Sequence, residues 1–177
     1  VNKRPLILVG KGIVYDTGGL SLKPTKGMDI MKVDMGGAAC VISAINAVAK
    51  INLPVYVIGL IPATDNRPSG NAYAPGDVVE MYDGTNVEVL NTDAEGRMIL
   101  ADALSYAKKY NPELVIDMAT LTGSAARTIG HFGIVSMHNK AEKQHQKLKE
   151  AGLEVYERLA EMPFWDEYDE LMKSDIA

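Results

Sequence analysis

The sequence predicts an α/β domain with a mainly parallel or mixed sheet and helices on both faces. Two observations predict this class. Short, continuous apolar runs, which are typical of strands buried on both faces, recur along the chain. Between them lie segments whose apolar residues repeat at helical spacing. Buried strands that alternate with helices indicate α/β layers, and 177 residues are enough to enclose one core.

The first part of the chain contains two predicted strands and one predicted helix. Pro5–Gly10 and Pro54–Ile61 are short apolar runs, and each predicts a buried strand. Gly36–Lys50 repeats its apolar residues at helical spacing and predicts a helix. Gly10–Gly27 is rich in Gly, Lys and Thr, and Pro62–Gly76 is rich in Pro and Gly, so both predict loops.

The remaining segments continue the pattern. Asp77–Tyr82 and Val87–Leu90 flank an Asp-Gly pair and predict a β-hairpin. Gly96–Tyr110 carries its apolar residues on one face and predicts a second long helix. Lys140–Met162 is charged and amphipathic, with a predicted break near Gly152. Two further buried strands are predicted over Glu113–Ala119 and Gly133–Met137.

Composition narrows the classes of function. The net charge of −5 argues against binding to a nucleic acid backbone and is compatible with a site rich in carboxylates. The single cysteine, Cys40, excludes an internal disulfide, fits a reducing, cytoplasmic compartment and is predicted to be a buried apolar residue. No continuous apolar run reaches the roughly 20 residues that span a bilayer, so we expect no membrane partner.

The first candidate site follows the first predicted strand, in Gly10–Gly19 (GKGIVYDTGG). A dinucleotide fingerprint would need glycine where Tyr15 stands, and a phosphate loop would need Ser or Thr where Gly12 stands. Both nucleotide interpretations therefore fail. The alternative is a tight turn with a solvated Lys11 and a turn-forming Asp16.

The second candidate is Asp34, which stands just before the first predicted helix. An N-cap is the simple structural interpretation of an aspartate at this position. Gly36 and Gly37 follow it, however, and two glycines weaken a first helical turn unless another group must approach the backbone closely.

The third candidate is Asn91–Arg97 (NTDAEGR). Thr92 and Glu95 fit a capping box for the helix that follows, which is again a purely structural interpretation. Asp93 and Glu95 are two positions apart, however, and in an extended chain such side chains point to the same side. They could therefore aim together at a cation, with Arg97 beyond them.

Together these segments supply four carboxylates, which would repel one another unless divalent cations bind between them. Oxygen ligands suit Mg²⁺ and Mn²⁺, and carboxylates also bind Zn²⁺. The three histidines, His131, His138 and His145, form no His-Glu-x-x-His pair and are predicted to be surface or packing residues. The four acidic residues are Asp16, Asp34, Asp93 and Glu95.

Asn91–Met98 (NTDAEGRM) closely resembles the signature octapeptide of the leucine aminopeptidase family, also called cytosol aminopeptidases. Its one departure is Met98, where the family usually has leucine, and this change conserves volume. The resemblance covers essentially the whole chain. Other segments resemble further family blocks in the same order and spacing: Val9–Gly19, Ser21-Leu22-Lys23, Met28–Ala38, Pro68-Ser69-Gly70, Pro75-Gly76-Asp77 and Ala119–Gly123.

The resemblance implies a set of metal ligands. Asp16 and Glu95 match the positions that bridge two ions. Lys11 and Asp34 match the more tightly held site, and Asp93 matches the more exchangeable one. The implied ions are Zn²⁺ or Mn²⁺, with Mg²⁺ or Co²⁺ as further options at the exchangeable site.

The resemblance also implies roles at the substrate. Lys23 matches the catalytic lysine, and Arg97 matches the arginine that holds a bicarbonate acting as general base. The backbone carbonyl of Leu121 matches the group that receives the leaving amine. Met31 matches part of the pocket for the first side chain, and Asp34 is expected to contact substrate as well.

The implied protein is a cytoplasmic metalloaminopeptidase that releases N-terminal residues of the leucine type from peptides, through water activated by two metals. The resemblance further implies a homo-hexamer with a zinc-peptidase-like fold. Residues 1–177 match a partial catalytic domain, because the family also has an N-terminal domain and a longer catalytic domain. Two alternatives stay open: a two-metal phosphoesterase and a non-catalytic DNA-binding or architectural role.

Overall fold

The computed structural model describes residues 2–177 and divides them into two compact units. The first unit runs to Leu121 and includes Ile176 and Ala177, and the second is Thr122–Asp175. Each unit has its own strands and helices. The predicted α/β class is confirmed.

A three-stranded parallel sheet forms the centre of the first unit. Its strands are β1 (Leu6–Gly10), β3 (Val57–Leu60) and β7 (Leu114–Met118), in the order β3-β1-β7. Leu6 of the central strand pairs with Val57 on one side and with Leu114 on the other. All three strands lie within predicted apolar runs, as expected for strands that are covered on both faces.

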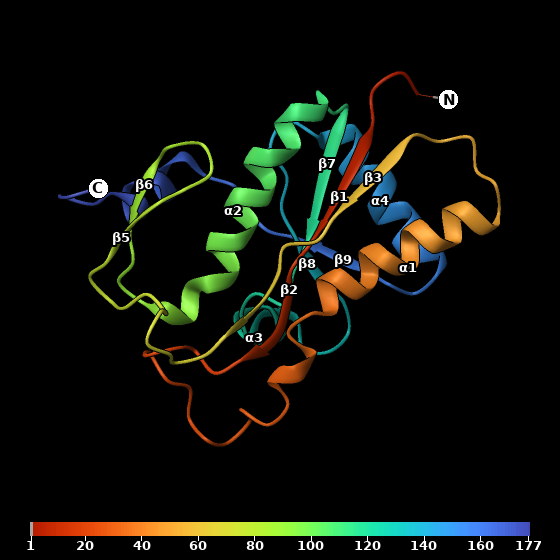
Figure 1. Cartoon of the computed structure of the whole chain (residues 1–177). Helices are drawn as coiled ribbons and strands as arrows, with labels where there is room; N and C mark the ends of the chain where they lie inside the picture. The colour runs from red at the N-terminus through yellow and green to blue at the C-terminus, as the bar shows by residue number, and fades with distance from the viewer. Residues whose placement is uncertain (1) are drawn as a thin grey trace. The chain divides into compact units, whose positions relative to one another are not determined.

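The two long helices cover opposite faces of this sheet (Figure 1). Ile7 and Val9 are completely buried on one face and form a core cluster with Leu100 and Ala107 of α2 (Glu95–Ala107). Side chains of β1 alternate between the faces, so the even-numbered positions face α1 (Gly36–Lys50). Both helices begin within one residue of their predicted positions.

On its buried face α1 packs closely against β3. Val41 is completely buried, and a Cβ on Gly59 would lie only 2.9 Å from a Val41 methyl and 3.3 Å from Ile45. Cys40 lies off this face and is exposed, so the prediction of a buried cysteine is wrong. The helix buries Gly37, Ala38 and Val41. Cys40 precedes Val41 by one residue, and one residue corresponds to about a quarter of a turn around the helix axis.

One stretch meets the length and composition of a membrane span, which the sequence analysis did not identify. Met31–Lys50 has 20 residues and a mean hydropathy of 1.3. The core helix of a globular protein meets the same criterion, and α1 packs Val41 against the central sheet. We therefore assign the face of α1 that carries Gly37, Ala38 and Val41 to the core of the first unit.

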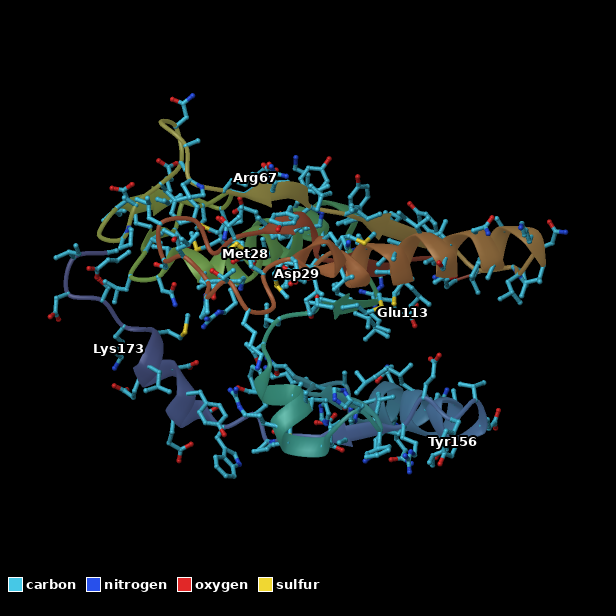
Figure 2. All side chains as sticks on the ribbon, turned by 90° about the horizontal axis from the view of Figure 1, so that it is seen from below. Met28, Asp29, Arg67, Glu113, Tyr156 and Lys173 are labelled. Carbon is cyan, nitrogen blue, oxygen red and sulfur yellow. The ribbon has the colours of Figure 1, made fainter. Side chains whose placement is uncertain are left out.

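Two short strands lie inside segments that were predicted to be loops. β2 (Gly12–Asp16) pairs in parallel with β4 (Ala63–Asn66), and the register shifts between Ile13 and Asp16. The prediction failed because neither strand is a continuous apolar run, and each ends in polar residues. Met28 and Asp29, labelled in Figure 2, lie in the true loop that leads from β2 to the 3₁₀ helix η1 (Met31–Val33).

The predicted hairpin is confirmed. β5 (Val78–Glu80) and β6 (Asn86–Glu88) are antiparallel, and Val79 pairs with Val87. Two 3₁₀ helices flank α2, and they are η2 (Thr92–Ala94) and η3 (Lys108–Tyr110).

The second unit contains α3 (Ser124–Ile129), the parallel pair β8 (Ile134–Ser136) and β9 (Leu159–Glu161), α4 (Glu142–Glu154) and the 3₁₀ helix η4 (Asp166–Met172). The predicted break near Gly152 is confirmed, because α4 ends at Glu154, and the rest of the segment contains β9. The chain reverses at Tyr156, which has a φ of 65° and is labelled in Figure 2. This reversal allows β9 to return beside β8, so that Ser136 pairs with Glu161.

The central sheet should dominate the stability of the first unit. Replacing Ile7 with alanine would leave a cavity between β1 and α2 and should lower the free energy of unfolding by about 2–5 kcal/mol. Ile42→Ala is the matched control, because Ile42 on α1 is 56% exposed and its truncation should change stability by about 0.5 kcal/mol or less. Denaturant unfolding measures both, and equal losses would contradict the core described above.

Candidate metal centre

The site is built around Lys11, which lies between the end of β1 and the start of β2. Its backbone N–H donates to the Met118 carbonyl at 3.0 Å, and its own carbonyl accepts from the Ala38 N–H at 2.9 Å. The residue is only 2% exposed, so the interpretation as a solvated lysine is wrong. Lys11 is thus fixed at the carboxyl end of the central strand, where α/β sheets commonly carry their sites.

The Lys11 ammonium has three acceptors, one for each of its N–H groups. Nζ lies 2.7 Å from Asp34 Oδ2 and 2.9 Å from Glu95 Oε1, and it donates to the Thr120 carbonyl at 3.3 Å. Burial opposes the charged form, but the hydrogen bonds and charges of both carboxylates outweigh it and raise the pKa of Lys11. Without a metal ion, the lysine is therefore a charged partner of the two acids.

Two glycines make room for this arrangement. A Cβ on Gly96 would lie 2.8 Å from both Cε and Nζ of Lys11. A Cβ on Gly37 would collide with the Met118 carbonyl, which is the group that accepts from the Lys11 N–H. The close backbone approach predicted from the pair Gly36-Gly37 is confirmed at Gly37.

Asp34 faces the cluster and does not cap the helix. The N-cap of α1 is Met35, which makes no side-chain cap hydrogen bond. Asp34 instead accepts a hydrogen bond from the Thr120 hydroxyl at 2.6 Å through Oδ1 and pairs with Lys11 through Oδ2. The N-cap interpretation is therefore wrong, and Thr120 orients this carboxylate.

Asp16 ends β2 and is 2% exposed. Its Oδ1 accepts from the Gly18 N–H and from the Asn66 amide, both at 2.8 Å, and its Oδ2 lies 2.9 Å from Lys23 Nζ. Burial would raise the pKa of Asp16, but these hydrogen bonds and the Lys23 charge lower it. The turn-forming role is confirmed, and the ion pair adds a second function to the same residue.

Lys23 joins Asp16 to Asp93, since its Nζ also lies 2.5 Å from Asp93 Oδ1. Burial opposes its charge, but the two carboxylates raise the pKa of Lys23. The Asp93 side chain is 32% exposed, whereas those of Asp16, Asp34 and Glu95 are at most 6% exposed. Asp93 is therefore the accessible member of the cluster.

Glu95 belongs to the cluster and not to a capping box. Thr92 donates its hydroxyl to the Gly18 carbonyl at 2.6 Å and accepts from the Ser21 N–H at 2.8 Å. Asn91 supplies the actual cap of η2, by accepting from the Asp93 N–H at 2.9 Å. Burial raises the pKa of Glu95 although Lys11 lies against it.

Sequence reasoning missed Asn66 and Thr120. The buried amide of Asn66 donates to Asp16 at 2.8 Å, to the Thr92 carbonyl at 3.0 Å and to Glu95 at 3.3 Å. Asn66 ends a strand that was predicted as loop, and no motif around it indicated this position. Thr120 directly precedes Leu121 in a predicted block, which was the only available signal.

The donor set fits divalent cations. Asp16, Asp34 and Glu95 are buried and offer oxygens that all lie within 4.8 Å of one another. Asp34 Oδ2 and Glu95 Oε1 have, among the described residues, no partner besides the Lys11 ammonium. With every group ionised, four carboxylates and two lysines leave the cluster with a net charge of −2 (four negative, two positive).

Three predicted site residues lie around the cluster without joining it. Arg97 follows Glu95 in α2 and is exposed, and its side chain makes no hydrogen bond or ion pair with the described part of the chain. Met31 opens η1, where its carbonyl accepts from the Asp34 N–H at 3.3 Å. Leu121, at the end of the first unit, is 44% exposed.

Comparison with known proteins gives consistent results. The family model described as "Cytosol aminopeptidase family, catalytic domain" matches residues 1–177. A probable cytosol aminopeptidase of Chlorobaculum tepidum is 54% identical over 176 residues, which are 99% of this chain and 35% of that protein. The chain thus spans about a third of the length of the curated relatives it matches.

Solved structures agree with the sequence relatives. A leucine aminopeptidase of Caenorhabditis elegans superposes with a TM-score of 0.94 and 40% identity, over 98% of this chain and 36% of that one. A bottromycin maturation enzyme in complex with Mn superposes with a TM-score of 0.91 and 38% identity, over 97% of this chain and 38% of that one.

Gly96→Ala should displace the Lys11 side chain, because the added methyl group needs the space of Cε and Nζ. Overpacking of this kind typically lowers the free energy of unfolding by about 1–3 kcal/mol. Denaturant unfolding measures this change. Gly70→Ala is the control, because a Cβ there meets nothing within 4 Å. A loss at Gly96 no larger than that at Gly70 would contradict the close contact with Lys11.

Asp16 and Glu95 should give stability opposite dependences on pH. The pKa of Asp16 is lowered, so its contribution is present above the unfolded value of about 3.9 and is lost as the pH falls through the folded value. The pKa of Glu95 is raised, so its contribution is present below about 4.3 and is lost as the pH rises through the folded value.

Denaturant unfolding with chelator present, between about pH 3 and pH 7, tests this contrast. The free energy of unfolding of wild type minus that of Asp16→Asn should decrease as the pH falls. The free energy of unfolding of wild type minus that of Glu95→Gln should decrease as the pH rises. Parallel trends in the two differences would contradict the opposite environments of the two carboxylates.

Proposed function

Because the chain belongs to the cytosol aminopeptidase family, we propose that it carries the metal centre of a metalloaminopeptidase. The enzyme would release N-terminal residues, with a preference of the leucine type, from peptides. The observation that carries this proposal is the buried cluster of Lys11 with Asp16, Asp34 and Glu95 at the carboxyl end of the central strand. The activity belongs to the longer protein, because this chain spans only about a third of its relatives.

The proposed ligands divide into two sites according to their burial. Lys11 and Asp34 are almost fully buried, which supports a tightly held ion between them. Asp93 is partly exposed, which supports an exchangeable ion on its side. Asp16 and Glu95 would bridge the two ions, and the Asn66 amide holds one oxygen of each carboxylate in place.

Lys11 can serve as a ligand only after it loses its proton, because an ammonium has no lone pair. The ion pairs with Asp34 and Glu95 hold the same nitrogen in a charged state when no metal is present. Metal binding and release of this proton are therefore linked. The linkage predicts weaker metal binding at lower pH.

Divalent cations in such a pair of sites, when bound, polarise a carbonyl and lower the pKa of water. We propose Zn²⁺ or Mn²⁺, with Mg²⁺ or Co²⁺ as alternatives at the exchangeable site, and a related enzyme was solved in complex with Mn. Cations would replace the Lys23 ammonium as partners of Asp16 and Asp93. The freed and still charged Lys23 would then stabilise the oxyanion that develops on the scissile carbonyl.

The outer residues are assigned the remaining roles. The exposed guanidinium of Arg97 has a planar fork that suits two hydrogen bonds to bicarbonate, which would act as the general base. The Leu121 carbonyl would accept a hydrogen bond from the leaving amine, and Met31 would line the pocket for the first side chain of the substrate. Asp34, beside Met31, would also contact the substrate.

We further propose that residues 1–177 are part of a larger catalytic domain that belongs to a cytoplasmic homo-hexamer. The exposed apolar side chains of the first unit are consistent with burial against further parts of the protein, as at Leu20, Leu22, Ile42 and Ile51. The negative net charge of −5 argues against a nucleic acid partner.

Hydrolysis of leucyl-amide substrates tests the proposed activity. This chain and the longer polypeptide that contains it would be assayed with Mn²⁺ or Zn²⁺ and with chelator. The proposal expects turnover by the longer polypeptide that depends on the metal. A folded, metal-loaded polypeptide without peptidase activity would contradict it, and phosphoester turnover in the same assay would replace it with the phosphoesterase alternative.

Lys23→Met should separate the two proposed roles of this lysine. The variant removes the ammonium that competes for Asp16 and Asp93, so Mn²⁺ should bind more tightly. Loss of the oxyanion partner should lower kcat by roughly 10²–10³-fold. Metal titration and leucyl-amide hydrolysis measure the two effects.

Lys26→Met is the matched control, because Lys26 is exposed in the same loop and should change neither affinity nor rate. Weaker Mn²⁺ binding by Lys23→Met would show that Lys23 supports the metal and does not compete with it.

A further inference from the structure

The second unit lacks an apolar core of its own among its described residues. Every fully buried apolar side chain of the described chain lies between Ile7 and Ala107, whereas Thr122–Asp175 buries His145, which is 8% exposed. Units of this size commonly depend on a disulfide or a metal ion to hold their elements together. The buried histidine is therefore the place to look for such a link.

His145 belongs to a cluster of potential metal ligands contributed by three elements. It lies in the first turn of α4, His138 follows β8, and Glu161 ends β9. His138 Nε2 lies 3.2 Å from Glu161 Oε1, and His145 Nδ1 lies 3.5 Å from Glu161 Oε2. The two imidazole rings are adjacent, with centroids 4.8 Å apart.

The spacing of these atoms suits a tetrahedral ion. Ligand atoms at 2.0–2.1 Å from a zinc ion stand about 3.3 Å from one another. Each imidazole is near this distance from a different oxygen of Glu161, at 3.2 Å from His138 Nε2 to Oε1 and 3.5 Å from His145 Nδ1 to Oε2. One ligand atom from each of the three residues lies within 4.8 Å of the others. Two imidazoles and one carboxylate, with a further position open to water, form a common zinc ligand set.

The hydrogen bonds around His145 favour a cation beside Nδ1. Nε2 of His145 lies 2.9 Å from the Ser136 hydroxyl, and this hydroxyl donates to the Ala160 carbonyl at 3.4 Å. A hydroxyl has one proton, so His145 must then donate from Nε2. The lone pair of a neutral His145 consequently stands on Nδ1 and faces the Glu161 carboxylate, and two acceptors in contact need a proton or a metal ion between them.

We propose that His138, His145 and Glu161 form a second metal site, separate from the carboxylate cluster of the first unit, which binds Zn²⁺ or a similar transition-metal ion. Imidazole ligands favour Zn²⁺, Co²⁺ and Ni²⁺ over Mg²⁺. Ser136 orients the His145 ring, as hydrogen-bond partners of metal-bound histidines generally do. The ion links β8, α4 and β9 and thereby stabilises the second unit.

Lys149 competes with the ion in this site. Its Nζ lies 3.0 Å from Glu161 Oε2, which is the oxygen that faces His145. The lysine side chain is 32% exposed, so it can turn into solvent when the metal binds. Removing the lysine charge should therefore tighten zinc binding.

Imidazole NMR of the whole chain during a Zn²⁺ titration tests the proposal. The resonances of His138 and His145 should shift together and saturate, while those of the exposed His131 should stay unchanged. The same concentrations of Mg²⁺ should leave all three imidazoles unchanged. Zinc held only by the carboxylate cluster would leave the imidazoles unshifted and would overturn the proposal without affecting the proposed peptidase site.

Bound zinc measured by equilibrium dialysis provides the matched comparison. His138→Gln should bind about one zinc ion fewer per chain than wild type, whereas His131→Gln should bind the wild-type amount. Ser136→Ala should weaken zinc binding by roughly 10-fold, and Lys149→Met should tighten it. Wild-type zinc affinity and stoichiometry in a folded His138→Gln variant would overturn the proposal.

Discussion

The contact of the Lys11 ammonium with Asp34 and Glu95 is the interaction on which the carboxylate cluster depends. It joins the end of the central strand to the turn before α1 and to the first turn of α2. A charged lysine that is 2% exposed can persist only because each of its N–H groups has an acceptor. The second residue of α2 is Gly96, which has no side chain and therefore leaves space for the Lys11 side chain to reach Glu95.

Before any metal binds, each of the four carboxylates of the cluster is paired with a lysine ammonium. Lys23 pairs with Asp16 and Asp93, where we propose that a cation binds, and the Asn66 amide and the Thr120 hydroxyl each hold a carboxylate oxygen, on Asp16 and Asp34 respectively. In the proposed metal centre a divalent ion replaces the proton of Lys11, whereas Lys23 keeps its charge. The second unit offers a contrasting set of ligands, with two imidazoles that favour transition-metal ions over Mg²⁺.

Sequence reasoning predicted the long elements and the acids but not how the acids are held. The apolar run of β1 and the helical spacing of α1 have strong periodic patterns, and both elements lie where they were predicted. β2 and β4 were missed because short strands with polar ends have no such pattern. Asp34 and Glu95 each fitted a helix-capping role locally, and only the contact with Lys11, far away in sequence, distinguishes the two interpretations. Asn66 could not be predicted, because its role depends on three partners that the fold brings together.

Proton release on metal binding tests most directly whether Lys11 becomes a neutral metal ligand. Calorimetric titration of the chain with Mn²⁺, in buffers that differ in ionisation enthalpy, counts the protons released. If Lys11 changes from a charged ion-pair partner to a neutral ligand, wild type should release about one proton more than Lys11→Met, which should also bind Mn²⁺ more weakly. Equal proton release and equal affinity in the two proteins would show that Lys11 remains a charged structural lysine, and would contradict the account.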